Sequence, residues 1–172
     1  MNESTFILKD INQYLVFISQ VKNLSENTTK SYERDLRKLS VFIKELKISN
    51  YSDISPEICS AWIGNLYNQN NNPKSIQRHL SSAKGFFRFL KKNNLVDSSP
   101  FELITAPKSP NTLPEVLSPE NVEQLLNFKP TNLIEIRDLA IVELMYSSGL
   151  RVSETVNINL SDFEDNMSFL RV

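Results

Sequence analysis

The segment NTTKSYERDLRKLSVFIKELK, residues 27–47, is repeated in outline 44 residues further on as NNPKSIQRHLSSAKGFFRFLK, residues 71–91. Aligned without gaps, the two segments share eight identical residue pairs. In both, apolar residues recur every three or four positions, which is typical of an amphipathic helix. We therefore predict two long helices that pack on one core. The expected core positions are Tyr32, Leu36, Leu39, Ile43 and Leu46 in the first helix, and Ile76, Leu80, Ala83, Phe87 and Leu90 in the second.

The polar faces of the two segments share a Lys-Ser-x-x-Arg pattern, at 30–34 and at 74–78. A shared core explains repeated leucines and phenylalanines, but it does not explain repeated cations on the solvent side. Lysine, arginine and serine can contact DNA phosphates, which position a protein on a duplex more than they specify its sequence. Contacts to base edges would come from Gln77, Arg78 or Lys84. A merely solvated face remains the alternative. The polar positions are Asn27, Lys30, Ser31, Arg34, Arg37 and Lys38, and then Lys74, Arg78, Ser81 and Ser82.

Capping residues and apolar periods predict further helices along the rest of the chain. Residues 107–114 contain three prolines and no apolar period, which predicts a stiff linker. Residues 160–166 read as a turn, and the alternation over 168–172 predicts the start of a strand. A strand needs a partner, so we expect a domain that is cut short. The predicted helices span 9–21, 55–67, 99–106 and 134–146, the last of them core, with one more beginning at Ser118.

Composition limits the classes of protein that fit this chain. A length of 172 residues allows one domain, or a small domain and part of another. Cys59 and His79 are the only residues of their kinds, which excludes an intrachain disulfide and argues against a zinc site. We see neither a membrane span nor a signal peptide, so we expect a cytoplasmic protein. The net charge of −1 divides into +5 over residues 1–108 and −6 over 109–172, which favours contact of the first part with a polyanion.

The string SSGLRVSE, residues 147–154, interrupts an apolar run with two serines and a glycine. Arg151 and Glu154 are three positions apart and so share one face of a helical turn. The planar guanidinium fork of arginine suits a phosphate, and a neighbouring glutamate can hold that fork in place. In isolation such a pair is most often a solvated ion pair.

With the residues around it, this string resembles the first catalytic-arginine motif of the tyrosine recombinases, and more narrowly that of the bacterial Xer type. The resemblance extends over almost the whole chain. The string Leu-Pro-x-x-Leu-Ser at 113–118 favours the XerD-like type, and the XerC-like type stays open. The matching strings are Leu24-Ser-x-x-Thr28, Ser31-Tyr32-x-x-Asp35-Leu36, Leu80-Ser-x-x-Lys-x-Phe86-Phe87-Arg88-Phe89-Leu90, Pro107-Lys108, Leu113-Pro114 and Leu117-Ser118.

The resemblance implies a mainly α fold. A helical, SAM-like core-binding domain would occupy residues 1–108, a linker 109–114, and the first part of a mixed α+β catalytic domain 115–172. Recombinases of this kind clamp duplex DNA, cut one strand with a tyrosine, hold the 3′-phosphate covalently and exchange strands without a metal, cofactor or external energy source. Related pairs act as tetramers that resolve chromosome dimers. The implied partners are double-stranded DNA and a related recombinase.

Carried over by position, the resemblance makes Arg151 the first catalytic arginine, which binds the scissile phosphate and stabilises its charge in the transition state. Glu154 matches the acidic residue that supports this site. The segments that face DNA in the family contain nine further residues, and the repeat adds Lys74. Together the candidate DNA-binding residues are Thr28, Thr29, Lys30, Arg34, Lys74, Ser75, Gln77, Arg78, Ser81 and Lys84.

The chain departs from the family pattern because the family's catalytic lysine, second arginine with its histidine, and nucleophilic tyrosine would all follow Val172. The tyrosines of this sequence all precede Arg151. Nucleophilic catalysis needs its nucleophile, so we expect this polypeptide to bind DNA without cleaving it. A naturally truncated, non-catalytic DNA-binding or regulatory protein is one alternative. A helical protein-interaction module with solvated charged faces is another.

Overall fold

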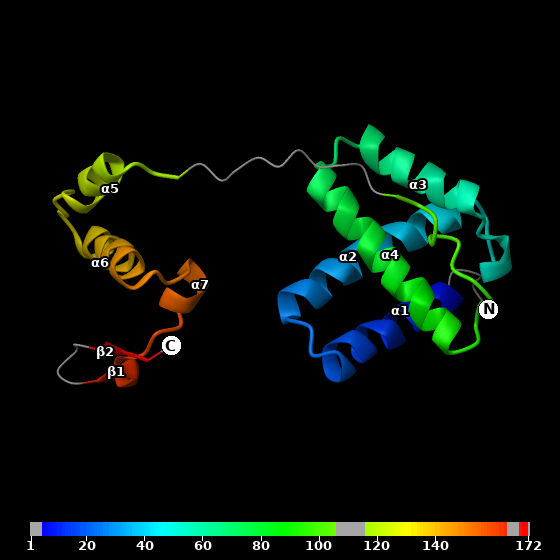
Figure 1. Cartoon of the computed structure of the whole chain (residues 1–172), viewed down its shortest axis with the longest axis horizontal. Helices are drawn as coiled ribbons and strands as arrows, with labels where there is room; N and C mark the ends of the chain where they lie inside the picture. Colours follow the sequence, from blue (N-terminus) through cyan, green and yellow to red (C-terminus); the bar gives the residue numbers. More distant parts are fainter. Residues whose placement is uncertain (1–4, 106–115, 165–168, 172) are drawn as a thin grey trace. The chain divides into compact units, whose positions relative to one another are not determined.

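The structure is a computed structural model that describes residues 5–105, 116–164 and 169–171. The chain separates into two compact units, Met1–Asn111 and Thr112–Val172. The division falls inside the predicted linker at 109–114, and the linker itself lies outside the described residues. Each unit contains its own set of helices (Figure 1).

The described part of the first unit contains the two long helices that the repeat predicts, together with two shorter ones. The hydroxyl of Ser25 accepts the N–H of Thr28, and the side chain of Asn72 accepts the N–H of Lys74. Both repeated helices thus begin at an N-cap residue, as their sequences indicate. The elements are α1 (Thr5–Val16), the π-helical turn η1 (Phe17–Val21), α2 (Glu26–Glu45), the 3₁₀ turn η2 (Tyr51–Asp53), α3 (Pro56–Asn68) and α4 (Pro73–Lys92).

Helix α4 lies at the centre of this unit, since α1, α2 and α3 all pack against it (Figure 1). The predicted core face of α4 is confirmed, because all five of its apolar positions are buried. Ser82 was expected on the polar face and is instead fully buried, where its hydroxyl donates to the carbonyl of His79. This internal hydrogen bond satisfies the hydroxyl and so removes most of the cost of burying it.

The core face of α2 is confirmed at its centre and not at its end. Leu36, Leu39 and Ile43 are buried, whereas Leu46 is 47% exposed. The helix stops at Glu45, and Lys47 takes a left-handed conformation with φ 57°. A left-handed residue of this kind is a common way to end a helix, and Leu46, the C-cap residue, still has helical dihedral angles but lies at this exposed end.

The helix that we predicted over 99–106 is not formed in its described part. The N–H of Glu102 donates to the carbonyl of Ser99, and the N–H of Ile104 donates to that of Phe101, so the chain makes turns here. Serine followed by proline opens a β-turn as readily as a helix, which explains the error. The turn places the buried ring of Phe101 against Trp62 and Phe87.

Close approach of α1 to α4 depends on Gly85. A Cβ built on Gly85 would lie 2.2 Å from the hydroxyl oxygen of Tyr14 and 3.3 Å from its Cζ. The ring of Tyr14 is buried and is held by Phe86 and Phe89, with centroid separations of 5.7 Å and 5.5 Å, so it has little room to move aside. Glycine at this position is therefore a packing requirement.

We expect Gly85→Ala to lower the free energy of unfolding by about 2 kcal/mol, because overpacking costs more than the helix propensity gained. The change Tyr14→Phe removes the clashing oxygen, so in that background Gly85→Ala should be neutral or stabilising by up to about 1 kcal/mol. Urea unfolding followed by the fluorescence of Trp62, the single tryptophan of the chain, measures both. An equal loss in both backgrounds would contradict this explanation.

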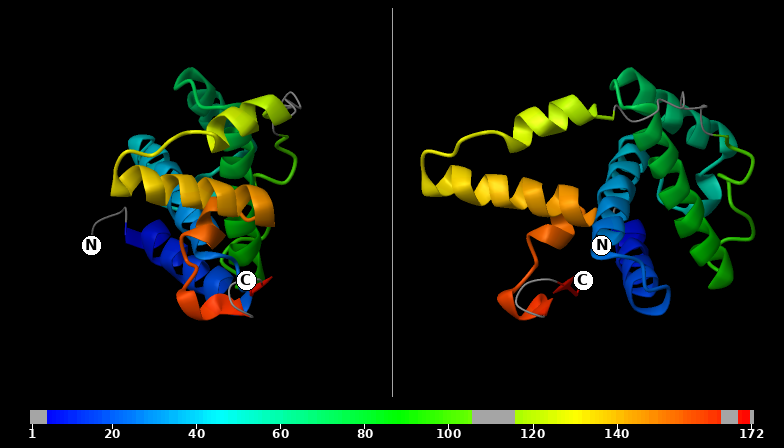
Figure 2. Two further views of the ribbon diagram at one scale, coloured as in Figure 1. Left: turned by 90° about the vertical axis from the view of Figure 1, so that its left-hand side faces the viewer. Right: turned by 60° about the vertical axis from the view of Figure 1, so that its left-hand side comes forward.

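The second unit begins with two helices that run side by side in opposite directions (Figure 2). Its helix starts agree with the sequence signals, since Ser118 caps α5 and Asn132 caps α6 through their side chains. Helix α6 ends at Gly149, which is left-handed with φ 66°. The elements are α5 (Pro119–Leu126), α6 (Leu133–Ser148), α7 (Val152–Thr155), the 3₁₀ turn η3 (Leu160–Asp162), β1 (Phe163–Glu164) and β2 (Phe169–Leu170).

Two sequence-based expectations for this unit are wrong. The segment predicted as a turn over 160–166 contains strand β1, and the predicted final strand β2, expected to lack a partner, pairs antiparallel with it and sets Phe163 opposite Leu170. Helix α6, predicted to be core, has no buried residue, and Ile134 and Ile136 are 63% and 51% exposed. Within the described residues only Thr155 of this unit is buried, so α6 has too few neighbours here to cover it.

The fold class is as predicted: mainly helical, with a two-stranded antiparallel sheet in the second unit. None of the helices in the described ranges combines the length and apolar character that crossing a membrane requires.

Candidate nucleic-acid interface and arginine turn

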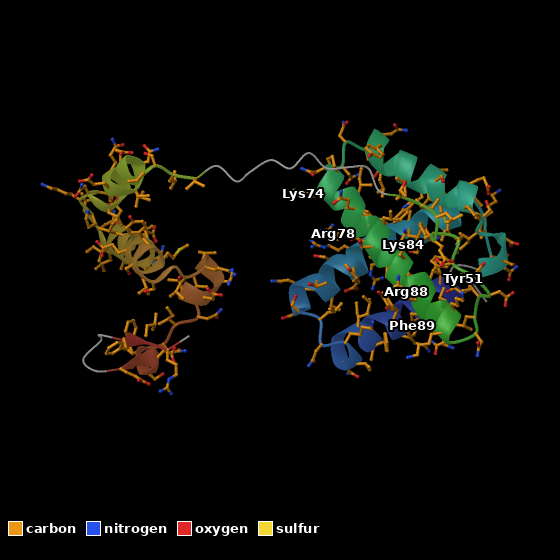
Figure 3. The ribbon with its side chains drawn as sticks, viewed as in Figure 1. Tyr51, Lys74, Arg78, Lys84, Arg88 and Phe89 are labelled. Carbon is orange, nitrogen blue, oxygen red and sulfur yellow. The ribbon has the colours of Figure 1, made fainter. Side chains whose placement is uncertain are left out.

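The candidate DNA-binding residues lie on the first turns of α2 and along α4. Lys74, Arg78, Lys84 and Arg88 follow one another along α4 (Figure 3). Lys30 and Arg34 occupy the first half of α2 and are exposed. Because α2 packs against α4, the repeated Lys-Ser-x-x-Arg pattern is carried by two adjoining helices of one rigid bundle.

Arg78 is bound to a buried carboxylate. Its Nε and Nη2 donate to Oδ2 and Oδ1 of Asp35 at 2.9 Å and 3.0 Å, so the contact between α4 and α2 is bidentate. Asp35 is 1% exposed, whereas the Arg78 side chain is 41% exposed. Bidentate arginine–carboxylate pairs are strong and fix the plane of the guanidinium. Asp35 raises the pKa of Arg78 further through this hydrogen bond.

His79 lies on the buried side of the same carboxylate. Its Nδ1 is 3.2 Å from Oδ1 of Asp35, and its ring meets Trp62 edge to face at 5.8 Å. Asp35 and His79 are 44 positions apart and so occupy equivalent positions in the two repeated segments. The contact between α2 and α4 therefore joins equivalent positions of the repeat. Burial lowers the pKa of His79, opposed by Asp35 and assisted by Lys38 and Arg78.

The lowered pKa of His79 predicts acid sensitivity of the first unit. A proton binds His79 more tightly in the unfolded chain than in the folded one. The free energy of unfolding therefore has its full value above the pKa of His79 in the unfolded chain and falls as the pH drops below that pKa. We expect the free energy of unfolding to fall by up to about 1 kcal/mol between pH 6.5 and 5.5. His79 is the only histidine, so His79→Gln should flatten this dependence. A slope that persists in the variant would assign it to other groups.

The remaining candidates on α2 are placed in different ways. The hydroxyl of Thr28 contacts that of the N-cap residue Ser25 (2.9 Å), and the hydroxyl of Thr29 is buried with no hydrogen-bond partner among the described residues. Lys30 pairs with Glu26 at 2.6 Å on the exposed surface, and Arg34 donates to the hydroxyl of Ser31 at 3.2 Å. Both contacts are exposed, so Lys30 and Arg34 are accessible to an anion that competes for them, whereas the Thr29 hydroxyl is buried.

The candidates on α4 show a similar mixture. Lys74 is exposed and makes no ion pair within the described part of the chain. Ser81 donates to the carbonyl of Gln77 at 2.9 Å, and Lys84 donates to the carbonyl of Glu102 at 3.3 Å. Ser75 and Gln77 are half-buried. The cations Lys30, Arg34 and Lys74 are thus exposed, whereas Lys84 and Arg78 are only partly so.

In the second unit, Arg151 and Glu154 form the contact that their spacing predicts. Arg151 is the N-cap residue of α7, and its Nη1 donates to Oε1 of Glu154 at 2.8 Å. The other carboxylate oxygen accepts the backbone N–H of Arg151 at 2.8 Å, which is the main cause of the lowered pKa of Glu154. The Arg151 side chain is 82% exposed. One carboxylate thus orients both the backbone and the fork of an accessible arginine.

Sequence reasoning missed Asp35 as a member of the interface, although it lies in one of the strings that carry the resemblance. A usable signal was present, since a charged residue directly beside Leu36 and four before Leu39 falls on the core side of α2. A buried carboxylate requires a partner, and the partner is the arginine of the other repeat. Among the described residues, no group of three or more potential metal ligands comes together.

Comparisons with known proteins match the two units separately. Residues 11–94 match the phage integrase N-terminal SAM-like domain, and residues 115–172 match the phage integrase family. The chain is 37% identical over 163 residues to the tyrosine recombinase XerD of Staphylococcus haemolyticus and 33% identical over 162 residues to that of Oceanobacillus iheyensis. These alignments cover 94% of this chain and 55% and 54% of the two relatives. The chain therefore spans about half the length of the curated relatives it matches.

A solved structure is similar as well. The integrase of the transposon Tn1549, in complex with transposon right end DNA, superposes with a TM-score of 0.64. The similarity covers 90% of this chain and 49% of that one, at 22% sequence identity. At that identity the likeness shows the fold.

Proposed function

Because the chain belongs to the phage integrase family of tyrosine recombinases, we propose that it supplies the DNA-binding domain and the first catalytic arginine of a Xer-type site-specific recombinase. The reaction of such an enzyme cleaves and rejoins DNA through a 3′-phosphotyrosine intermediate and resolves chromosome dimers. In this proposal residues 1–108 bind duplex DNA, residues 115–172 begin the catalytic domain, and a related recombinase completes a tetramer on DNA. The corresponding compartment is the cytoplasm.

The observation that carries this proposal is the pair of adjoining helices with accessible cations at matching positions. Lys30, Arg34 and Lys74 are exposed on α2 and α4, and the Arg78 fork is held between the two helices by Asp35. A rigid pair of helices with cations at fixed spacing can neutralise several phosphates without ordering loops on binding. The Tn1549 integrase, which shares the fold, is a DNA complex, and this agrees with the same use of the fold here.

Arg151 is assigned to the scissile phosphate. Its exposed guanidinium, braced by Glu154, can donate two hydrogen bonds to phosphate oxygens and stabilise charge that develops during phosphoryl transfer. The described structure places one such arginine and no nucleophile beside it. We therefore propose that the 172-residue chain binds DNA and leaves it uncut.

Equilibrium binding to a short duplex over a salt series tests the proposal. We expect log Kobs to fall linearly with log salt, with a slope of about −0.9 for each phosphate contacted. The same titration on residues 1–105 separates the contribution of the first unit. Absence of binding at low salt would overturn the proposal in favour of a protein-interaction module. Strand cleavage by the purified chain would overturn the inactive assignment and leave the binding assignment intact.

A further inference from the structure

A second group of cations lies along the other half of α4 and lacks the carboxylate partners found in the first half. Lys84, Arg88 and Lys92 are spaced four residues apart, so they share one side of the helix. Like charges at this spacing repel one another and destabilise the helix. Lys92 lies in the last turn, where the helix dipole favours a cation, but Lys84 and Arg88 lie too far from the end for that explanation.

These three residues line a groove of about 520 Å³ formed by α1, η1, α2 and α4. Lys22 enters the groove from the end of η1, and its Nζ lies 6.0 Å from the centre of the Phe17 ring. The Nζ of Lys92 lies 5.7 Å from the centre of the same ring. Four cations thus converge on one groove, which we call the α1–α4 groove. None of the described residues that line this groove is acidic.

Elsewhere on the two repeated helices, three of the cations have carboxylate partners. There Lys30 is paired with Glu26, Arg37 with Glu33 and Arg78 with Asp35. Among the described residues, no ion pair is formed by any of the four cations of the groove, and Lys84 reaches only a backbone carbonyl. The charge that would balance the groove is therefore absent from the described part of the chain.

The groove also presents ring surface next to its cations. Phe17 and Phe89 are half-buried and stack at 5.3 Å, and Tyr14 lies behind Phe89 at 5.5 Å. Burial raises the pKa of Tyr14 to about 12, so its hydroxyl remains neutral and adds no negative charge. A ligand that matches this lining has phosphates for the cations and apolar carbon for the rings.

We propose that the α1–α4 groove is a second DNA-backbone site, in which Lys22, Lys84, Arg88 and Lys92 bind phosphates and the Phe17 and Phe89 edges contact deoxyribose carbons. The inference rests on the proposed function and extends it. Ser81 and Lys84 belong both to the groove and to the predicted interface, so the two surfaces are continuous. Arg78 and Lys92 are about 21 Å apart along the helix, at 1.5 Å per residue. Helix α4 is thus anchored to the backbone over most of its length.

The test compares the wild-type chain with Arg88→Glu/Lys92→Glu and with a control of equal charge change, Lys9→Glu/Lys44→Glu. Lys9 and Lys44 are exposed and lie outside the groove. We expect the groove variant to bind duplex DNA at least tenfold more weakly, with the salt slope smaller by about 1.8, which is two phosphate contacts. The control should change affinity less than threefold. Far-ultraviolet circular dichroism and the milder Arg88→Gln/Lys92→Gln variant separate lost contacts from lost folding.

The outcomes of this experiment distinguish the groove from the function on which it rests. No binding by the wild-type chain overturns both proposals. If the wild-type chain binds DNA and the groove variant has the same slope of log Kobs against log salt, only the groove proposal is overturned. Equal losses in the groove variant and the control also overturn it, because net charge would then explain the effect. The groove variant could instead lose affinity only for single-stranded DNA of the same length and keep its affinity for the duplex. That result would assign the rings to base stacking and overturn the duplex assignment.

Discussion

Replacing Arg78 by alanine is expected to lower the free energy of unfolding of the first unit by about 3 kcal/mol, although the side chain lies partly at the surface. The cost comes from Asp35, which is 1% exposed and would lose both of its guanidinium hydrogen bonds. His79, at 3.2 Å, would be the only cationic partner left within the described contacts of Asp35, and it is charged only when protonated. Removing one member of a buried pair leaves an uncompensated charge, which is far more costly than removing both.

The control for this prediction is the double variant Arg78→Ala/Asp35→Ala. It should recover at least half of the lost stability, because the buried charge is removed together with its partner. In Arg78→Ala alone the unpaired Asp35 favours protonated His79, so the loss of stability on acidification should be smaller than in the wild type. Urea unfolding by Trp62 fluorescence at pH 7.5 and 5.5 measures both effects. Additive losses in the double variant would show that the ion pair is not the cause.

The helical bundle was predictable because its information is local and periodic. The apolar stripe of α4 is buried as its spacing indicates, and Ser25 and Asn72 cap the helices that they precede. The Arg151–Glu154 contact followed from spacing as well, because residues three apart on a helical turn meet without help from the rest of the fold. In each of these features, the contacts of a residue are determined by its neighbours in the sequence.

The features that sequence reasoning missed depend on another segment. The Asp35–Arg78 pair joins residues 43 positions apart, and neither residue alone indicates that the other repeat supplies its partner. Apolar composition made α6 look like core, but burial depends on neighbours, and its apolar residues are spread around the helix so that no single face is marked. The helix predicted from Ser99 was wrong for a third reason, since serine followed by proline is a signal both for a helix start and for a β-turn.

Charge reversal at the start of the repeated helices, in Arg34→Glu/Lys74→Glu, is expected to weaken duplex binding by at least 100-fold in about 0.1 M salt, because two phosphate contacts become repulsive. The same change should leave the free energy of unfolding unchanged or raise it by up to about 1 kcal/mol. Lys74 is the second residue of α4, whose first turn contains no acidic residue, so this cation opposes the positive end of the helix dipole.

If Arg34→Glu/Lys74→Glu weakens DNA binding and also raises the free energy of unfolding, the two effects together would show why a cation occupies position 74. A lysine that weakens its own helix is understandable where it binds an anion, and it has no packing role here because its side chain is exposed. The control Lys9→Glu/Lys44→Glu has the same change in net charge away from the helix starts, and its affinity should fall less than threefold. If Arg34→Glu/Lys74→Glu instead bound DNA as tightly as the control, the solvated-face interpretation of the repeat would be the correct one, and the phosphate contacts would have to lie elsewhere on the bundle.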